Sequence, residues 1–313
     1  MHALPQQNGR PFLTDGGLET TLIFHEGLDL PQFAAFPLLA DPQGERLLRD
    51  YFRTYAALAA RFDAGLILET PTWRANTDWG AQLGYDARAL AAVNRRAVRL
   101  LEEIRAEFAA SRNPIVLSGC IGPRGDGYVP GARMSAPEAE QYHQAQIAVF
   151  ADSACDLVSA FTLNYVEEAI GIVHAARKAN VPVVVSFTVE TDGRLPTGQT
   201  LGEAIGQVDD ASAGYPAYFM LNCAHPAHID RAVRDGGRWT TRVRGLRVNA
   251  SRLSHAELNE SPILDDGNPA ELGRECAALV AGPLAHVNVF GGCCGTDHRH
   301  VEKIAEACLA EPC

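Results

Sequence analysis

Three cysteines in the second half of the chain have the types and spacing of a metal site. Cys293 and Cys294 are adjacent and lie between Gly292 and Gly295, and Cys223 belongs to an earlier segment. Thiolates favour a borderline-soft ion such as zinc over magnesium or calcium. Three protein ligands leave the fourth tetrahedral position open, as in catalytic zinc sites. We therefore predict that these cysteines bind Zn²⁺; the alternative is that they are buried small apolar residues.

The chemistry of such a site favours transfer to a thiol. Three thiolates donate electron density to the ion, which makes it a poor Lewis acid for hydrolysis. A substrate thiol that binds zinc loses its proton and stays nucleophilic. A zinc-dependent hydrolase or lyase, and a non-catalytic metal buffer, remain as alternatives. Without metal, we expect oxidation to form a disulfide, either Cys293–Cys294 or Cys223–Cys294.

Eight short apolar segments are predicted to be strands. They are rich in Val, Ile, Leu and Phe and lack polar alternation, which is typical of strands buried on both faces of a parallel sheet. They are Pro11–Thr14, Leu66–Glu69, Ile115–Ser118, Leu157–Phe161, Val183–Phe187, Tyr218–Leu221, Leu246–Val248 and His286–Phe290.

Longer segments between them have apolar residues at helical spacing. They are Glu45–Arg61, Ala87–Phe108, the segment from a capping box at Ser135 to Phe150, Glu167–Lys178, Leu201–Gln207, Pro226–Asp235, Pro269–Ala281 and Asp297–Leu309. Eight strand–helix units predict an α/β fold, a (β/α)8 TIM barrel in which residues 1–313 form a single domain. An open doubly wound sheet is the alternative.

A barrel predicts that the functional residues follow the carboxyl ends of the strands. Polar and glycine-rich groups occur at those positions. They include Asp15, Gly16 and Gly17 after the first strand, Glu69 after the second, Glu190 after the fifth and Asn222 next to Cys223 after the sixth. These residues are the candidates that would surround the metal.

Composition excludes several classes of partner. The chain has 313 residues, with 27 Lys and Arg against 38 Asp and Glu, a formal net charge of −11. This acidity argues against nucleic acid, whose phosphates require clustered Lys and Arg. No apolar run approaches the ~18–20 residues of a membrane span, and the N-terminus lacks a signal-peptide core. We expect a cytoplasmic protein with reduced thiols.

The motifs together resemble the homocysteine S-methyltransferase family, and the resemblance runs over nearly the whole chain. The matching segments are Asp15-Gly-Gly-Leu-Glu, Ser186-Phe-Thr-Val-Glu190, Asp192-Gly-Arg-Leu195, Gly198-Gln-Thr-Leu201, Asn222-Cys223 and Gly291-Gly-Cys-Cys-Gly-Thr296. The resemblance implies a barrel that binds zinc through Cys223, Cys293 and Cys294 and methylates homocysteine to methionine.

The family also implies the partners. Its members use S-methylmethionine, S-adenosylmethionine, betaine, or methylfolate through cobalamin as the methyl donor. A chain of this length has no room for folate and cobalamin domains, so we expect the single-domain type. Its partners would then be a small-molecule thiol acceptor and an onium methyl donor, with neither nucleic acid nor membrane.

The resemblance implies roles for single residues, with one departure. Asp15 is expected to hold the amino-acid part of homocysteine, near Gly16, Gly17 and Asn222. Family members often have a glutamate at the end of strand four that binds the substrate ammonium, whereas this sequence has Phe161. The ring could offer a cation–π face. Glu69 or Glu190 is predicted to supply the missing charge, and both join Asp15 as catalytic candidates. Alternatively, the acceptor is another small thiol or selenol without a free amine.

Overall fold

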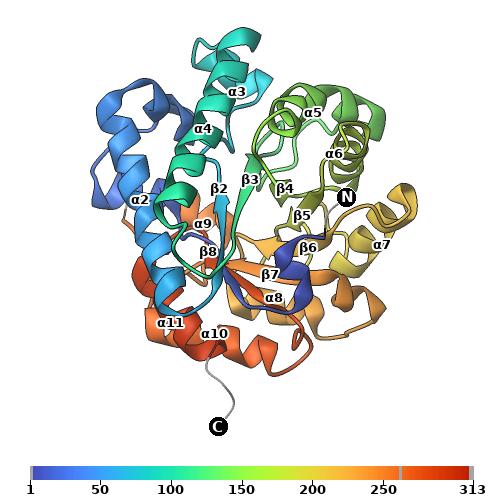
Figure 1. Cartoon of the computed structure of the whole chain (residues 1–313). Helices are drawn as coiled ribbons and strands as arrows, with labels where there is room; N and C mark the ends of the chain where they lie inside the picture. The colour runs from blue at the N-terminus through green and yellow to red at the C-terminus, as the bar shows by residue number, and fades with distance from the viewer. Residues whose placement is uncertain (1–2, 261–262, 310–313) are drawn as a thin grey trace.

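The computed structural model describes residues 3–260 and 263–309, so the predicted domain limits 1 and 313 lie outside the described residues. Eight parallel strands form a closed barrel in chain order, and β1 pairs with β8 as well as with β2 (Figure 1). The strands are β1 (Phe12–Leu13), β2 (Gly65–Glu69), β3 (Ile115–Ile121), β4 (Leu157–Leu163), β5 (Val183–Phe187), β6 (Tyr218–Asn222), β7 (Val243–Val248) and β8 (Val289–Gly292). The predicted TIM barrel is confirmed, and the open sheet is excluded.

The principal helices surround the barrel. They are α2 (Pro42–Arg61), α4 (Ala87–Glu107), α5 (Ala136–Ala151), α6 (Val166–Lys178), α7 (Leu201–Ser212), α8 (Pro226–Val233), α10 (Pro269–Val280) and α11 (His298–Cys308). The capping box before α5 forms as predicted, because the Ser135 amide donates to the Glu138 carboxylate over 2.8 Å. Within the described ranges, no helix has both the length and the apolar character that a membrane crossing requires.

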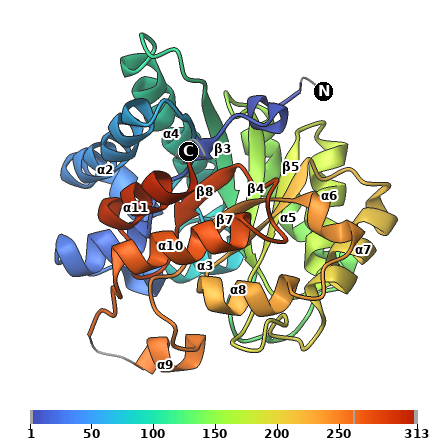
Figure 2. The ribbon, with the colours of Figure 1, turned by 90° about the horizontal axis from the view of Figure 1, so that it is seen from below.

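Shorter helical elements in the loops were not predicted, because segments this short carry no full apolar stripe. They are α1 (Leu18–Thr20), α3 (Thr77–Gln82), α9 (His255–Glu260), the 3-10 helices Pro5–Asn8, Pro31–Phe33, Phe36–Ala40 and Arg238–Arg242, and the π-helical turn Thr21–His25. Figure 2 shows α9 extending beyond α8 and α10 at one end of the barrel.

Strand β8 differs from its prediction. The apolar pattern placed it at His286–Phe290, whereas it begins at Val289 and continues into Gly292. His286 instead precedes the strand, and its ring nitrogen contacts the Thr240 carbonyl over 2.8 Å. Because β8 ends at Gly292, the cysteine pair follows the strand directly. Backbone pairing in the barrel therefore fixes the position of Cys293.

Two apolar layers make up the core. An inner cluster fills the barrel, and an outer one lies between the strands and helices. Side chains two residues apart on a strand point to the same face. Ile67 belongs to the inner cluster, so Glu69 also points inward. On β7, Gly245 faces Met220 of the inner cluster, which places Arg247 on the same inner side. The strands therefore deliver two charged side chains to the barrel interior.

Candidate active site

The three predicted metal ligands lie together at the carboxyl ends of β6 and β8. The sulfur atoms of Cys223, Cys293 and Cys294 are all within 4.8 Å of one another. Cys223 and Cys293 are paired as a disulfide with Cα atoms 5.4 Å apart, and Cys294 is free. This pairing differs from both disulfides expected from the sequence.

Strand β7 explains why Cys223 and Cys293 meet. The amide of Cys223 donates to the carbonyl of Arg247 over 3.1 Å, and the amide of Cys293 donates to the carbonyl of Val248 over 2.8 Å. Consecutive carbonyls of a strand point to opposite sides. Cys223, after β6, therefore bonds to one edge of β7, and Cys293, after β8, bonds to the other edge. Cys223 has φ 54°, a left-handed conformation that is unusual for a residue with a side chain. This turn aims its sulfur at the cysteine pair.

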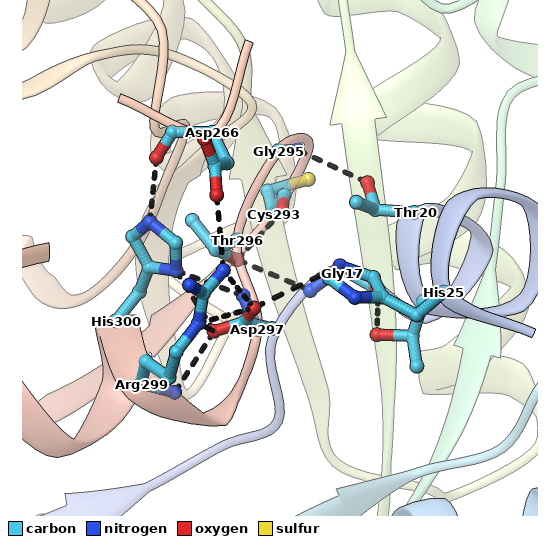
Figure 3. A network of polar contacts seen from close by, with 11 residues as sticks. Gly17, Thr20, His25, Asp266, Cys293, Gly295, Thr296, Asp297, Arg299 and His300 are labelled. Atoms are coloured by element: carbon cyan, nitrogen blue, oxygen red, sulfur yellow. Dashed lines mark hydrogen bonds and ion pairs between the residues drawn. The ribbon is translucent and has the colours of Figure 1, made fainter. Parts of the chain in front are cut away.

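A polar network holds the turn that follows the cysteine pair (Figure 3). The hydroxyl of Thr296 donates to the Cys293 carbonyl over 2.7 Å, and the Gly295 amide donates to Thr20 over 3.0 Å. Gly17 donates its amide to the Thr296 carbonyl over 3.0 Å. A Cβ on Gly17 would lie 2.5 Å from the Cys293 carbonyl oxygen, so only glycine permits this approach. The loops after β1 and β8 therefore support the sulfurs jointly.

The start of α11 anchors this turn from behind. Asp297 caps the helix and pairs with Arg299 over 2.6 Å. Arg299 also pairs with Asp266 over 3.0 Å, and a ring nitrogen of His300 contacts the Asp266 carbonyl over 2.7 Å. These contacts, drawn in Figure 3, join the segment before α10 to the helix that follows the cysteine pair.

A cavity of about 90 Å³ adjoins the sulfurs. Most of the predicted site residues line it, whereas Glu190 does not. The lining residues are Asp15, Gly16, Gly17, Leu18, Glu19, Thr20, Phe33, Glu69, Thr70, Pro71, Trp73, Cys120, Tyr128, Phe161, Thr162, Asn222, Cys223, Arg247, Cys293 and Cys294. Above the sulfurs, the Tyr128 hydroxyl lies 3.4 Å from Cys223 Sγ and 3.6 Å from Cys294 Sγ.

Asp15 is held by a buried ion pair that the sequence analysis missed. Arg247 Nη2 lies 2.6 Å from Asp15 Oδ1, and the Tyr51 hydroxyl donates to Asp15 Oδ2 over 3.0 Å. Burial raises the pKa of Asp15, although Arg247 and Tyr51 act in the opposite direction. An arginine between the apolar residues Leu246 and Val248 was the available signal, because such a side chain is rarely buried unless it is paired.

Two further carboxylates face the cavity. Burial raises the pKa of Glu69 to about 7 and that of Glu19 to about 7. Glu69 is 4% exposed, and within the described part of the chain its Oε2 atom has no hydrogen-bond partner. Glu19 lies on α1 and was not assigned a role, although it ends the motif that begins at Asp15. The cavity is therefore acidic.

Glu190 lies in a second contact group outside the cavity. Its carboxylate lies 2.9 Å from Nδ1 of His255, on α9. The other ring nitrogen of His255 is 2.5 Å from the Cys223 carbonyl, and the ring stacks on Tyr128 with 4.2 Å between centroids. Glu190 is thus connected to the backbone of Cys223 through the ring of His255. The sequence offered no sign of α9, so this link could not be predicted.

Asn222 and Phe161 line the cavity, but both are engaged with the protein. The Asn222 amide oxygen accepts from Ser186 over 2.6 Å and from the Thr162 amide over 2.9 Å, and its amide nitrogen donates to the Thr162 hydroxyl over 2.8 Å. The Phe161 ring faces Arg247, whose guanidinium carbon is 5.0 Å from the ring centre. The cation on the Phe161 face is therefore a residue of the chain itself.

Comparisons with known proteins agree with this fold. The profile of the family described as homocysteine S-methyltransferase matches residues 12–308. The structure resembles the oxidized form of the homocysteine methyltransferase MmuM from Escherichia coli, with a TM-score of 0.74 and 19% identity over 97% of this chain and 98% of that one. The metallated form of the same protein gives a TM-score of 0.73 and 18% identity, over 96% and 97% of the two chains.

A curated relative is much longer. Methionine synthase from Mycobacterium tuberculosis is 26% identical over an alignment of 259 residues that covers 79% of this chain and 20% of that protein. The match with methionine synthase from Mycobacterium leprae is similar, at 25% identity over the same shares. The chain therefore spans about a fifth of the length of these relatives.

Proposed function

The chain belongs to the homocysteine S-methyltransferase family, and from this premise we propose that it is a zinc-dependent enzyme that transfers a methyl group from a small onium donor to the thiol of homocysteine, giving methionine. The prediction of a methyltransferase is confirmed at the level of the family. The observation that carries the full proposal is the group of three sulfurs on the wall of an acidic cavity.

The three cysteines fit a zinc ion. With Zn–S bonds of about 2.3 Å, tetrahedral ligands lie about 3.8 Å apart, and the three sulfur atoms here all lie within 4.8 Å of one another. Burial raises the pKa of the Cys294 thiol, so thiolates at this place require a cation beside them. Cys223, Cys293 and Cys294 would hold the ion. When bound, zinc lowers the pKa of an acceptor thiol and keeps it nucleophilic.

The residues of the cavity would orient the acceptor. We assign Asp15 to the amino-acid part of homocysteine, with Arg247 and Tyr51 fixing the carboxylate. The unpartnered Oε2 of Glu69 is available to accept from the ammonium group, in place of the glutamate that Phe161 replaces. Glu190 keeps a positioning role through His255. Asn222 positions Thr162 and the neighbouring Cys223.

The reaction itself requires alignment more than acid–base catalysis. The methyl carbon leaves a positively charged sulfur or nitrogen, whose bonding electron pair stays on that atom, and bonds to the acceptor sulfur. The thiol proton is released to solvent. Holding the two ligands in line, away from water, supplies most of the rate enhancement. S-methylmethionine and betaine are the compact candidates for the donor, and S-adenosylmethionine is the large one.

A panel of donors and acceptors tests the proposal. Zinc-loaded protein is incubated with homocysteine or selenohomocysteine and with S-methylmethionine, S-adenosylmethionine or betaine, and the products are identified by mass spectrometry. We expect one methionine for each methyl group lost by a compact donor. Hydrolysis of the donor without methylation of either acceptor would favour the hydrolase alternative instead.

Glu69→Gln is expected to weaken acceptor binding. Losing a hydrogen bond to a charged group costs about 1.5–3 kcal/mol, which corresponds to a rise in KM for homocysteine of about 10- to 100-fold. The turnover number should change much less, because the ammonium group takes no part in bond exchange. Steady-state kinetics at saturating donor measure both constants.

A matched acceptor provides the control for Glu69→Gln. The homocysteine analogue without its amino group should have the same KM in the wild type and the variant. Phe161→Glu should give no gain in homocysteine affinity, because the new carboxylate would pair with Arg247. A clear gain in that variant would indicate that the native acceptor has no amine.

Oxidation of the metal-free protein is expected to block zinc uptake. Hydrogen peroxide would take two electrons and two protons from the thiols of Cys223 and Cys293, forming a disulfide and water, because their Cα separation of 5.4 Å suits that bond. Zinc binding should return after reduction with dithiothreitol, and protein loaded with zinc beforehand should be protected. Full zinc uptake by peroxide-treated protein would contradict this expectation.

A further inference from the structure

Glu19 is a carboxylate of the cavity that neither the metal site nor acceptor binding uses. It lies on α1, in the loop between β1 and α2, and lines the cavity with the sulfurs. In the part of the chain that the structure describes, no other residue forms an ion pair or a hydrogen bond with its carboxylate. A side chain placed this way is available to a ligand.

The charges of the cavity do not balance. Three acids line it, Asp15, Glu19 and Glu69, whereas Arg247 is its one basic residue among those described. Arg247 pairs with Asp15 over 2.6 Å, which leaves the other two carboxylates without a cationic partner in the same described part. The Oε2 atom of Glu69 is buried and also lacks a hydrogen-bond partner there. Carboxylates that line a cavity favour a ligand of opposite charge, so the cavity suits ligands with two positive groups between them.

Arg74 also acts electrostatically on Glu19, but its side chain is engaged elsewhere. Its guanidinium carbon lies 4.1 Å from the centre of the Trp73 ring and 3.8 Å from that of Trp79. It also donates to the Gly125 carbonyl over 3.1 Å. Arg74 influences Glu19 only as a more distant charge. Among the described residues, Glu19 therefore has no cation in direct contact, and a cationic ligand would supply one.

The two unpaired carboxylates lie at different depths. Glu69 belongs to an inner strand and is almost fully buried, whereas Glu19 is partly exposed. Phe33, which is 41% exposed, and the rings of Trp73 and Tyr128 also line the cavity. Aromatic faces together with a carboxylate are suited to a methylated sulfonium or quaternary ammonium group. Glu69, the deeper acid, would then bind the acceptor, and Glu19, the outer acid, would bind the donor.

From these observations we infer that Glu19 binds the cationic group of the methyl donor and determines the enzyme's specificity for charged donors. The inference rests on the proposed methyl transfer and deepens it. The positive charge of the donor disappears as the methyl group leaves with no electrons. An anion beside it therefore stabilises the bound donor at least as well as the transition state, and contributes to binding more than to turnover.

The test is the isosteric variant Glu19→Gln. We expect KM for S-methylmethionine or betaine to rise about tenfold or more, while KM for homocysteine and kcat stay within about threefold. Calorimetric titration of the same two donors, without acceptor, should show the same loss of affinity. Glu26→Gln is the matched control, because it removes the same charge from an exposed position outside the cavity lining. It should match the wild type.

The outcomes separate this inference from the proposed function. If Glu19→Gln retains wild-type donor affinity, or weakens homocysteine binding instead, the inference is overturned while methyl transfer stands. If the wild type binds the donors through Glu19 but methylates neither acceptor, the proposed function fails and the cation site remains. Circular dichroism and zinc content establish that the variant is folded, and Glu19→Asp, which keeps the charge, should recover part of the donor affinity.

Discussion

Serine at position 223, 293 or 294 is expected to remove most of the bound zinc and to lower the rate of methyl transfer about a thousandfold or more. An ion that has lost one of three thiolate ligands binds weakly, and the loss of its electrostatic contribution to the acceptor thiol is worth several kcal/mol. The fold should persist, because a catalytic metal need not supply folding energy and the barrel has its own apolar core. Metal analysis and thermal unfolding measure the two effects.

Cys155→Ser is the matched control for these three variants. Cys155 is partly buried and does not line the cavity, so its replacement should leave zinc content and activity unchanged. Stoichiometric zinc in Cys223→Ser, Cys293→Ser and Cys294→Ser alike would refute the ligand assignment. A loss of zinc accompanied by unfolding would instead indicate that the metal site carries structural energy.

Arg247→Met is expected to lower the free energy of unfolding by about 3–5 kcal/mol. Methionine approximates the volume of the arginine stem, but Asp15 is then left buried without its cation, and breaking a buried pair from one side costs that much. Urea denaturation followed by circular dichroism measures the loss. The double variant Asp15→Asn with Arg247→Met should recover part of it, because the uncompensated charge is gone.

The stability lost in Arg247→Met is expected to depend on pH. Burial raises the pKa of Asp15, and removal of Arg247 raises it further. An acid whose pKa is higher in the folded state binds its proton more tightly there, so stability falls as pH rises above the unfolded pKa of about 3.9. Arg247→Met should therefore lose more stability at pH 7 than at pH 4. An equal loss at both values would show that Asp15 is not the group responsible.

The architecture was accessible from sequence because its signals are local. The apolar runs Ile115–Ser118 and Val183–Phe187 lie within β3 and β5, since strands buried on both faces need continuous apolar side chains. The Ser135 capping box likewise requires only residues within one helical turn. The predicted ends of strands were less accurate where glycine continues a strand, as in β8, because a residue without a side chain gives no periodic signal.

Part of the candidate site was also predictable. Residues at the carboxyl ends of parallel strands converge at one end of a barrel, so Asp15, Glu69 and the cysteines were expected near one another. Arg247 was overlooked because a charged residue between Leu246 and Val248 does not change the apolar character of the predicted strand. Glu19 lay within a quoted motif, but only the cavity shows that its carboxylate faces the same space as the sulfurs.

Residue order alone therefore predicted the barrel, the end of it where the candidate site lies and the three cysteines that meet there, because each depends on spacing along the chain. Which charged side chains form ion pairs depends on distances across the barrel. Only the folded arrangement pairs Asp15 with Arg247, directs Glu190 to His255 and, among the described residues, leaves Glu19 and Glu69 without an ion pair. Electrostatic energy varies with separation in space and with burial, and neither can be read from separation in sequence.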